Sequence, residues 1–122
     1  MNCRQMAKME VEVDGISILG IHIPINSKRT KTLFWETVLQ NAESFRDGPA
    51  LIIGDFNTGL PVDAQGTPFH CVQHMERLGK MGWQDALRLI NGSRPEYSWY
   101  SNVGNGFRID HAFATIRIRN VN

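Results

Sequence analysis

The tetrapeptide at residues 54–57, Gly-Asp-Phe-Asn, places a carboxylate two residues before an amide, and both groups can act on one reacting centre. It lies at the end of residues 50–54, a short continuous apolar run that predicts a strand covered on both faces. Ligand sites of open sheets gather at the carboxyl ends of strands, so this position favours a functional site. The alternative is an Asx turn, in which Asp55 only accepts a hydrogen bond from its own backbone.

The segment at residues 107–111, Phe-Arg-Ile-Asp-His, is a second candidate and follows Asn105-Gly106, a strong turn signal. Side chains alternate between the two faces of a strand, so Asp110 and His111 cannot easily bond each other. We therefore expect His111 to point away from the site and not to be the catalytic base. The alternative for Asp110 is a surface ion pair with Arg108, which contributes little to stability.

Hydrophobic periodicity predicts an α/β or α+β chain, with one sheet and with helices on one of its faces. Strands are expected over residues 9–13, 16–23, 50–54, 97–101 and 107–118, and helices over residues 30–46, 71–81 and 83–90. The first two strands are joined by Asp14-Gly15, a hairpin signal. Trp35 is expected to pack, and apolar residues should line one side of the first helix (Phe34, Val38, Ala42, Phe45) and of the last (Trp83, Ala86, Leu87, Ile90).

Length and composition are those of an ordinary globular chain: 122 residues, at most one domain, with 42% hydrophobic and 20% charged residues. The net charge is only +1, but residues 86–122 carry five arginines against two acidic residues, a balance of +3 that suits contact with phosphate. The alternative is that these arginines form a solvated surface.

With two cysteines, no signal peptide and no apolar run of membrane-spanning length, we expect a reduced, cytoplasmic protein without a membrane partner.

One competing cluster consists of His70, Cys71 and His74. Together with Cys3 these side chains could bind zinc, although their spacing matches no strong zinc pattern. The alternative, which we favour, is that Cys71 is a small apolar residue at the start of a helix.

Three segments, in this order and spacing, resemble the signature motifs of the endonuclease/exonuclease/phosphatase superfamily: residues 54–57, Tyr97-Ser98-Trp99-Tyr100 and residues 106–110. Residues 22–24, His-Ile-Pro, and residues 82–86, Gly-Trp-Gln-Asp-Ala, fit the same pattern. The sequence is most similar to the exodeoxyribonuclease III and pancreatic deoxyribonuclease branches. The resemblance implies an α/β fold: part of a two-sheet β-sandwich with covering helices, mainly one sheet being present, and residues 1–122 forming a partial domain.

The resemblance also implies four catalytic residues that converge at one end of the sheet. Asp55 orients or deprotonates the attacking water or protonates the leaving oxygen, and Asn57 hydrogen-bonds the scissile phosphate and that water. Asp110 orients a catalytic histidine. His22 matches the second catalytic histidine of the pancreatic branch, or is alternatively a structural residue at a strand end. Asp55 and Asn57 are expected to hold Mg²⁺ or Mn²⁺.

By the same resemblance, Trp99, Phe107 and Ile109 line a nucleotide pocket, and Arg108 is expected to bind substrate as well. Trp99 is alternatively a core residue. The implied function is Mg²⁺-dependent hydrolysis of a phosphodiester, with DNA as the favoured substrate and DNA repair as the setting. The open alternatives are an inactive nucleic-acid-binding module, a phosphatase or phosphodiesterase acting on a small-molecule or lipid phosphate, and a gene fragment without independent function.

The metal-binding Glu of the family, and its catalytic His in a Ser-Asp-His segment, have no counterpart in this sequence. We therefore expect an internal piece of the family domain, truncated at both ends, with little or no nuclease activity of its own. The second sheet would be largely missing, so the apolar face of residues 18–23 and 51–53 should be under-covered. Self-association through that uncovered face is expected to follow.

Overall fold

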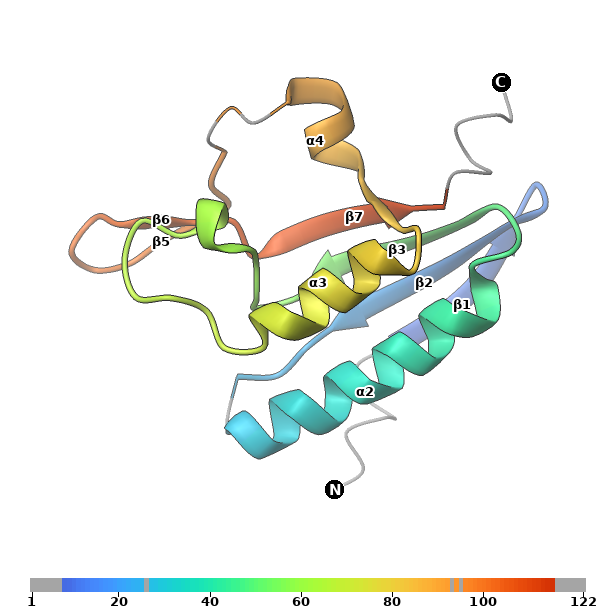
Figure 1. The fold of residues 1–122 in the computed structure, drawn as a ribbon, viewed down its shortest axis with the longest axis horizontal. Helices are drawn as coiled ribbons and strands as arrows, with labels where there is room; N and C mark the ends of the chain where they lie inside the picture. The colour runs from blue at the N-terminus through green and yellow to red at the C-terminus, as the bar shows by residue number, and fades with distance from the viewer. Residues whose placement is uncertain (1–7, 26, 93, 95, 116–122) are drawn as a thin grey trace.

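The structure, a computed structural model, describes residues 8–25, 27–92, 94 and 96–115, which form a mixed α/β fold (Figure 1). Five strands make one sheet in the order β1-β2-β3-β7-β4. Their bounds are Lys8–Val13 for β1, Ile16–His22 for β2, Ala50–Asp55 for β3, Gln84–Asp85 for β4 and Asp110–Ala114 for β7. A separate small sheet pairs β5 (Trp99–Tyr100) with β6 (Gly106–Phe107). The α/β class with one main sheet, predicted from the sequence, is confirmed.

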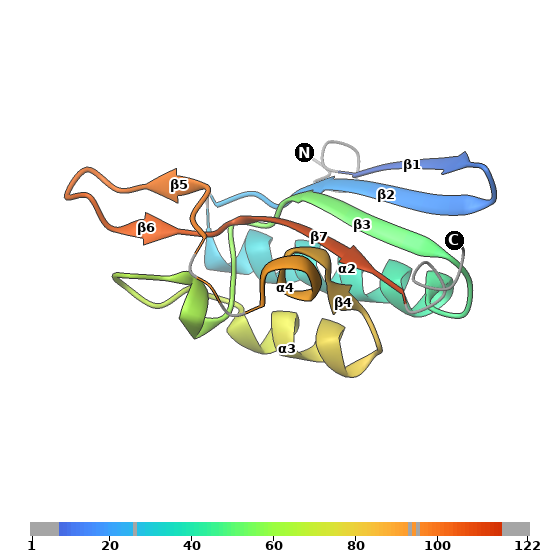
Figure 2. The same cartoon turned by 90° about the horizontal axis from the view of Figure 1, so that it is seen from above.

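The helices pack on one face of the main sheet (Figure 2). Their bounds are Lys28–Phe45 for α2, Val72–Lys80 for α3 and Ala86–Asn91 for α4, and a short 3-10 helix spans Pro61–Asp63. Helix α2 begins after Ser27, whose side chain accepts a hydrogen bond of 3.0 Å from the Thr30 backbone and so caps the helix. The predicted stripe faces the sheet, with Phe34, Trp35, Val38, Leu39 and Ala42 buried and Phe45 partly buried.

The opposite face of the sheet is apolar and open. Strand register places Val11 beside Ile18, Ile18 beside Leu51, and Gly20 beside Ile53, so these side chains share one face. Val11 and Ile53 are each 46% exposed, whereas residues on the helix side of the same strands, such as Leu19 and Ile52, are buried. No helix or strand of the described residues covers this open face. The predicted under-covered face is confirmed, and the prediction that residues 50–54 are covered on both faces is wrong.

The helix predicted over residues 83–90 is wrong in its start. Residues 84–85 form the edge strand β4, and α4 begins at Ala86. The reason is a cap: the extended Asp85 accepts hydrogen bonds from the backbones of Leu87 and Arg88, at 3.1 and 3.4 Å, which ends the strand and starts the helix. Ile90 is 79% exposed and does not share a buried side with Trp83, which lies in the core.

The predicted strands at 97–101 and 107–118 are shorter in the structure. Only two residues of the first are extended, and the second is divided into β6 and β7. The break has a side-chain cause, because the Ser98 hydroxyl accepts hydrogen bonds from the backbones of Ile109 and Asp110, at 3.0 and 3.3 Å, in place of a strand partner. Residues 116–118 lie outside the described residues. Within the described part, no helix combines the length and apolar character needed to cross a membrane.

Candidate active site

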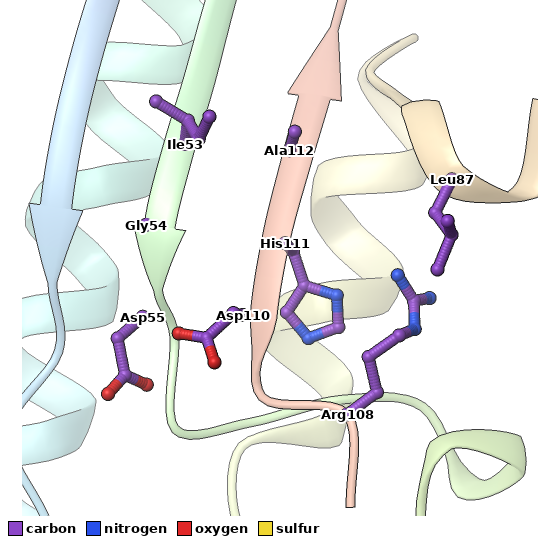
Figure 3. Close-up of a pocket in the computed structure, with 8 residues that line it drawn as sticks. All are labelled: Ile53, Gly54, Asp55, Leu87, Arg108, Asp110, His111 and Ala112. Atoms are coloured by element: carbon purple, nitrogen blue, oxygen red, sulfur yellow. The ribbon is translucent and has the colours of Figure 1, made fainter. Parts of the chain in front are cut away.

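Three of the predicted catalytic side chains lie in one row across the open face. His22 on β2 is in register with Asp55 on β3, and Asp55 is in register with Asp110 on β7. Paired residues of neighbouring strands point to the same face, and the His22 Nε2 and Asp55 Oδ2 atoms are 3.8 Å apart. Asp55 and Asp110 line a shallow pocket of about 380 Å³ beside β7 (Figure 3). The predicted convergence at one end of the sheet is therefore found.

Asn57 joins this row through an Asx turn. Its backbone N–H donates to the Asp55 Oδ1 atom at 2.9 Å, and its side-chain Nδ2 donates to the Ile23 carbonyl at 2.6 Å. Its φ of 47° lies in the left-handed region, which Asn tolerates better than most residues. The turn and the functional interpretation are thus compatible, because the turn is what holds the amide beside the carboxylate. The Asn57 Oδ1 atom is the side-chain acceptor left for a ligand.

Gly54 lets the two central strands approach at this point. Its φ is 147°, a region that only glycine adopts readily, and a Cβ atom built on it would lie 1.9 Å from the Ile21 carbonyl oxygen. Gly54 is therefore required for two reasons: its backbone conformation, and the close approach of β2 to β3 at this residue.

Negative charge accumulates at this end of the sheet. Burial raises the pKa of Asp55, and the neighbouring Asp110 raises it further, while the Asn57 N–H and His22 act in the opposite direction. Carboxylate and amide oxygens are the ligands that Mg²⁺ prefers, and this ion keeps several waters and needs only one or two carboxylates. The donor set fits a hydrated Mg²⁺ or Mn²⁺. Among the described residues, however, no group of three or more His, Cys, Asp or Glu lies where it could by itself hold a metal ion.

His111 leaves β7 on the side opposite Asp110 (Figure 3). Its ring is buried, its Nε2 atom lies 2.7 Å from the Thr58 carbonyl oxygen, and it packs edge-on against Phe56 with ring centres 5.2 Å apart. Burial and then the positive Arg108 lower the pKa of His111, which disfavours the charged form of the ring. The prediction that His111 points away from the carboxylates holds for its Nε2 atom, which bonds Thr58, but the ring still borders the pocket that Asp55 and Asp110 line.

Arg108 lies in a buried ion network. Its guanidinium bonds Asp63 Oδ1 at 3.0 Å and also pairs with the Asp85 carboxylate, and Arg88 donates to Asp63 at 2.7 Å. Arg108 is 3% exposed and Asp63 is 1% exposed. Substrate binding by Arg108 stays a prediction, but the observed contacts give it a structural role that the sequence did not indicate. It ties the 3-10 helix, β4 and the start of β7 together.

The small sheet of β5 and β6 carries two of the predicted nucleotide-binding side chains, Trp99 and Phe107, and projects from the end of the main sheet at which β3 ends and β7 begins (Figure 2). Trp99 and Phe107 face each other across the two strands, with ring centres 5.6 Å apart, and Phe69 packs against Phe107 at 5.7 Å. Trp99 is 51% exposed, so it is not a core residue, while Ile109 is half-buried. An exposed indole is a surface on which a base can stack.

The competing zinc cluster does not form among the described residues, where His74 is buried and bonded to Glu36 at 2.9 Å. Cys71 is buried immediately before α3, as expected for a small apolar residue. Cys3 lies outside the described residues.

Several residues of the site escaped the sequence analysis. Lys31 bonds the Asn57 carbonyl, Ser98 fixes the start of β7, and Asp63 pairs with Arg108. Each of these contacts joins residues that are far apart in the sequence, so no local sequence pattern predicts it. For Lys31 the sequence contained one indication. A basic residue in the first turn of a helix is unfavourable because of the helix dipole, so another contact is expected to compensate for it.

No protein-family model matches this sequence, and no curated protein matches it. Solved structures do match. An AP endonuclease from Archaeoglobus fulgidus superposes on 90% of this chain with a TM-score of 0.77 and 20% identity. The 3′ phosphatase NExo from Neisseria, bound to a product DNA hairpin, superposes on 89% with a TM-score of 0.77 and 18% identity. This chain spans 52% of each of those chains, about half their length.

At these identities the likeness shows the fold alone. Both structures have the endonuclease/exonuclease/phosphatase fold, the fold of pancreatic deoxyribonuclease, and the present chain has that fold as well. The fold implied by the sequence resemblance is thereby confirmed.

We predict that Arg108→Met destabilises the fold by about 3–5 kcal/mol, because it removes the guanidinium that pairs with both the buried Asp63 and the partly buried Asp85, and leaves Asp63 with Arg88. Urea unfolding measures this loss. The matched control is Arg94→Met, which removes an exposed pair with Glu96 and should cost at most about 1 kcal/mol. Equal losses in the two variants would contradict the assigned role of the buried network.

Proposed function

We propose that this chain carries part of the active site of a Mg²⁺- or Mn²⁺-dependent phosphodiester hydrolase that acts on DNA. The observation that supports this most is the row of His22, Asp55 and Asp110, with Asn57 fixed beside it, at the carboxyl end of the central strands. The fold similarity to a protein named as an AP endonuclease and to a 3′ phosphatase bound to DNA supports the same class.

Asp55 and Asn57 would hold the metal ion, since they present oxygen ligands at a place where two carboxylates already lie together. When bound, such an ion neutralises the charge of the phosphate and stabilises the leaving oxygen.

The chain's own residues orient the water and the phosphate. Asp55 accepts a hydrogen bond from the attacking water, and the open side of Asn57 faces the phosphate. Within the described residues Asp110 makes no ion pair, so its exposed carboxylate is free to orient the ring of a histidine from another segment. His22, whose side chain is 70% exposed, lies next to Asp55 and would be in reach of a leaving group or a phosphate oxygen.

DNA is the favoured substrate because the hairpin of β5 and β6, which carries the exposed Trp99 and its partner Phe107, projects from the end of the main sheet at which β7 begins with Asp110 (Figure 2). Aromatic side chains stack on the flat rings of nucleic-acid bases, and a lipid or inositol phosphate has no such ring. A role in DNA repair and a cytoplasmic location stay predictions from the sequence. An inactive nucleic-acid-binding module, and an enzyme acting on small-molecule or lipid phosphates, are the alternatives that the following experiment separates.

We predict that Mg²⁺, added at constant ionic strength, raises the affinity of the chain for a DNA hairpin containing an abasic site by at least about fivefold. The reason is that Asp55 and Asn57 would hold the ion, and its positive charge would attract the phosphate. Fluorescence anisotropy of labelled DNA measures the effect. Mg²⁺ ordinarily weakens contacts with the DNA backbone by competing for it, so an increase is diagnostic.

The Asp55→Asn variant should lose the Mg²⁺ effect, and Asp47→Asn, which changes an exposed loop carboxylate, should keep it. Equal affinity with and without Mg²⁺ would favour the inactive binding module. Absence of DNA binding would favour a small-molecule or lipid phosphate. Cleavage by the isolated chain is expected to be weak or undetectable, because the expected catalytic histidine and metal-binding Glu are not among its residues.

We also propose that the isolated chain self-associates, with a second copy packed on the open apolar face that contains Val11, Ile18, Leu51 and Ile53. Two sheets pack face to face about 10 Å apart when their inner faces are apolar. We predict that Val11→Lys lowers the weight-average mass measured by sedimentation at high concentration. Leu33→Lys, at an exposed position of α2 on the other side of the molecule, should not. A monomeric wild-type chain would refute this proposal.

A further inference from the structure

Lys31 is a buried cation beside the candidate site, and no motif of the sequence includes it. Only 7% of its surface is exposed, although lysine is almost never buried unless it is paired. Burial lowers the pKa of its ammonium group, while Cys71 and Asp55 act in the opposite direction. A side chain with this cost of burial needs a compensating contact.

That contact is the backbone of Asn57. The Lys31 Nζ atom donates a hydrogen bond to the Asn57 carbonyl oxygen. Asn57 is then fixed by hydrogen bonds from three elements: its carbonyl to Lys31 on α2, its backbone N–H to Asp55 on β3, and its side-chain Nδ2 to Ile23 at the end of β2. Its φ of 47° is a conformation that needs such support.

The position of Lys31 also breaks a local rule of helix formation. The first turn of α2 contains Lys28, Arg29 and Lys31 and no acidic residue, although the positive end of the helix dipole disfavours cations there. Lys28 and Arg29 are exposed to solvent, where the cost is small, but Lys31 is buried. Departures from local rules are expected at functional sites, where another contact compensates for them.

We propose that Lys31 is a positioning residue, which holds the Asn57 carbonyl so that the Asn57 N–H stays on Asp55 and its side chain stays beside the phosphate position. This inference deepens the proposed function, and its consequence for hydrolysis rests on that function. The positioning itself is a property of the protein without metal or DNA, so it is tested separately.

The test is amide hydrogen exchange, measured by NMR for Asn57 and, as a reference for global stability, for Ile52 in the middle of β3. In Lys31→Met the Asn57 amide should exchange at least about tenfold faster, the effect of losing a hydrogen bond from a charged donor, while the Ile52 amide is unchanged. Lys31→Arg, which keeps the charge, should restore most of the protection. Lys28→Met, at an exposed position of the same helix turn, should match wild type.

Equal acceleration of exchange at Asn57 and Ile52 in Lys31→Met would show that Lys31 only stabilises the fold. Unchanged exchange at Asn57 would show that Lys31 does not position the turn. Either result overturns the proposal. If Lys31→Met does not fold, Lys31→Gln is measured in its place, and failure of both to fold also overturns it. In the DNA assay, Lys31→Met should lose most of the Mg²⁺ effect. Absence of that effect in the wild-type chain would overturn the proposed function alone, because the exchange comparison uses neither metal nor DNA.

Discussion

The register between β2, β3 and β7 is the constraint on which the site depends. Because His22 pairs with Asp55 and Asp55 pairs with Asp110, three polar side chains from distant parts of the sequence point to one face. A shift of one residue in any of these pairings would turn one of them toward the helices. Gly54 maintains the pairing of β2 with β3, since a Cβ atom there would meet the Ile21 backbone. The strand pairing therefore positions these three side chains on one face whether or not they hydrogen-bond to one another.

Two polar networks hold the flanking loops against the strands of the main sheet. On one side, Lys31 and Asp55 hold the turn at Asn57. On the other, the buried pairs of Arg108 with Asp63 and Asp85 hold the segment that leads into β7. Buried ion pairs contribute little net stability compared with apolar residues of the same shape, so we infer that their role here is to fix one arrangement of the loops. His111 lies near the second of these networks, bonds the Thr58 carbonyl and packs against Phe56 in the aromatic core.

Much of this could be predicted from the sequence, because the relevant signals are local. Period-two alternation and Asp14-Gly15 predicted the first hairpin, the apolar stripe predicted α2, and alternation along β7 separated His111 from Asp110. The errors arose where distant contacts decide the structure. Asp85 ends a strand by capping a helix, Ser98 divides the last predicted strand in two, and Arg108 is buried by partners 45 and 23 residues away. No pattern within a short window reports such partners.

The central proposal is that Asp55 and Asn57 hold a metal ion at the end of the sheet, beside Asp110. The most direct measurement is a Mn²⁺ titration followed by NMR, in which the paramagnetic ion broadens the signals of nearby amides. We expect the amides of His22, Asp55, Asn57 and Asp110 to broaden first, and the effect to disappear in Asp55→Asn. Broadening centred on the exposed Glu10 and Glu12 of β1, or on His70 and His74, and unaffected by Asp55→Asn, would contradict the account.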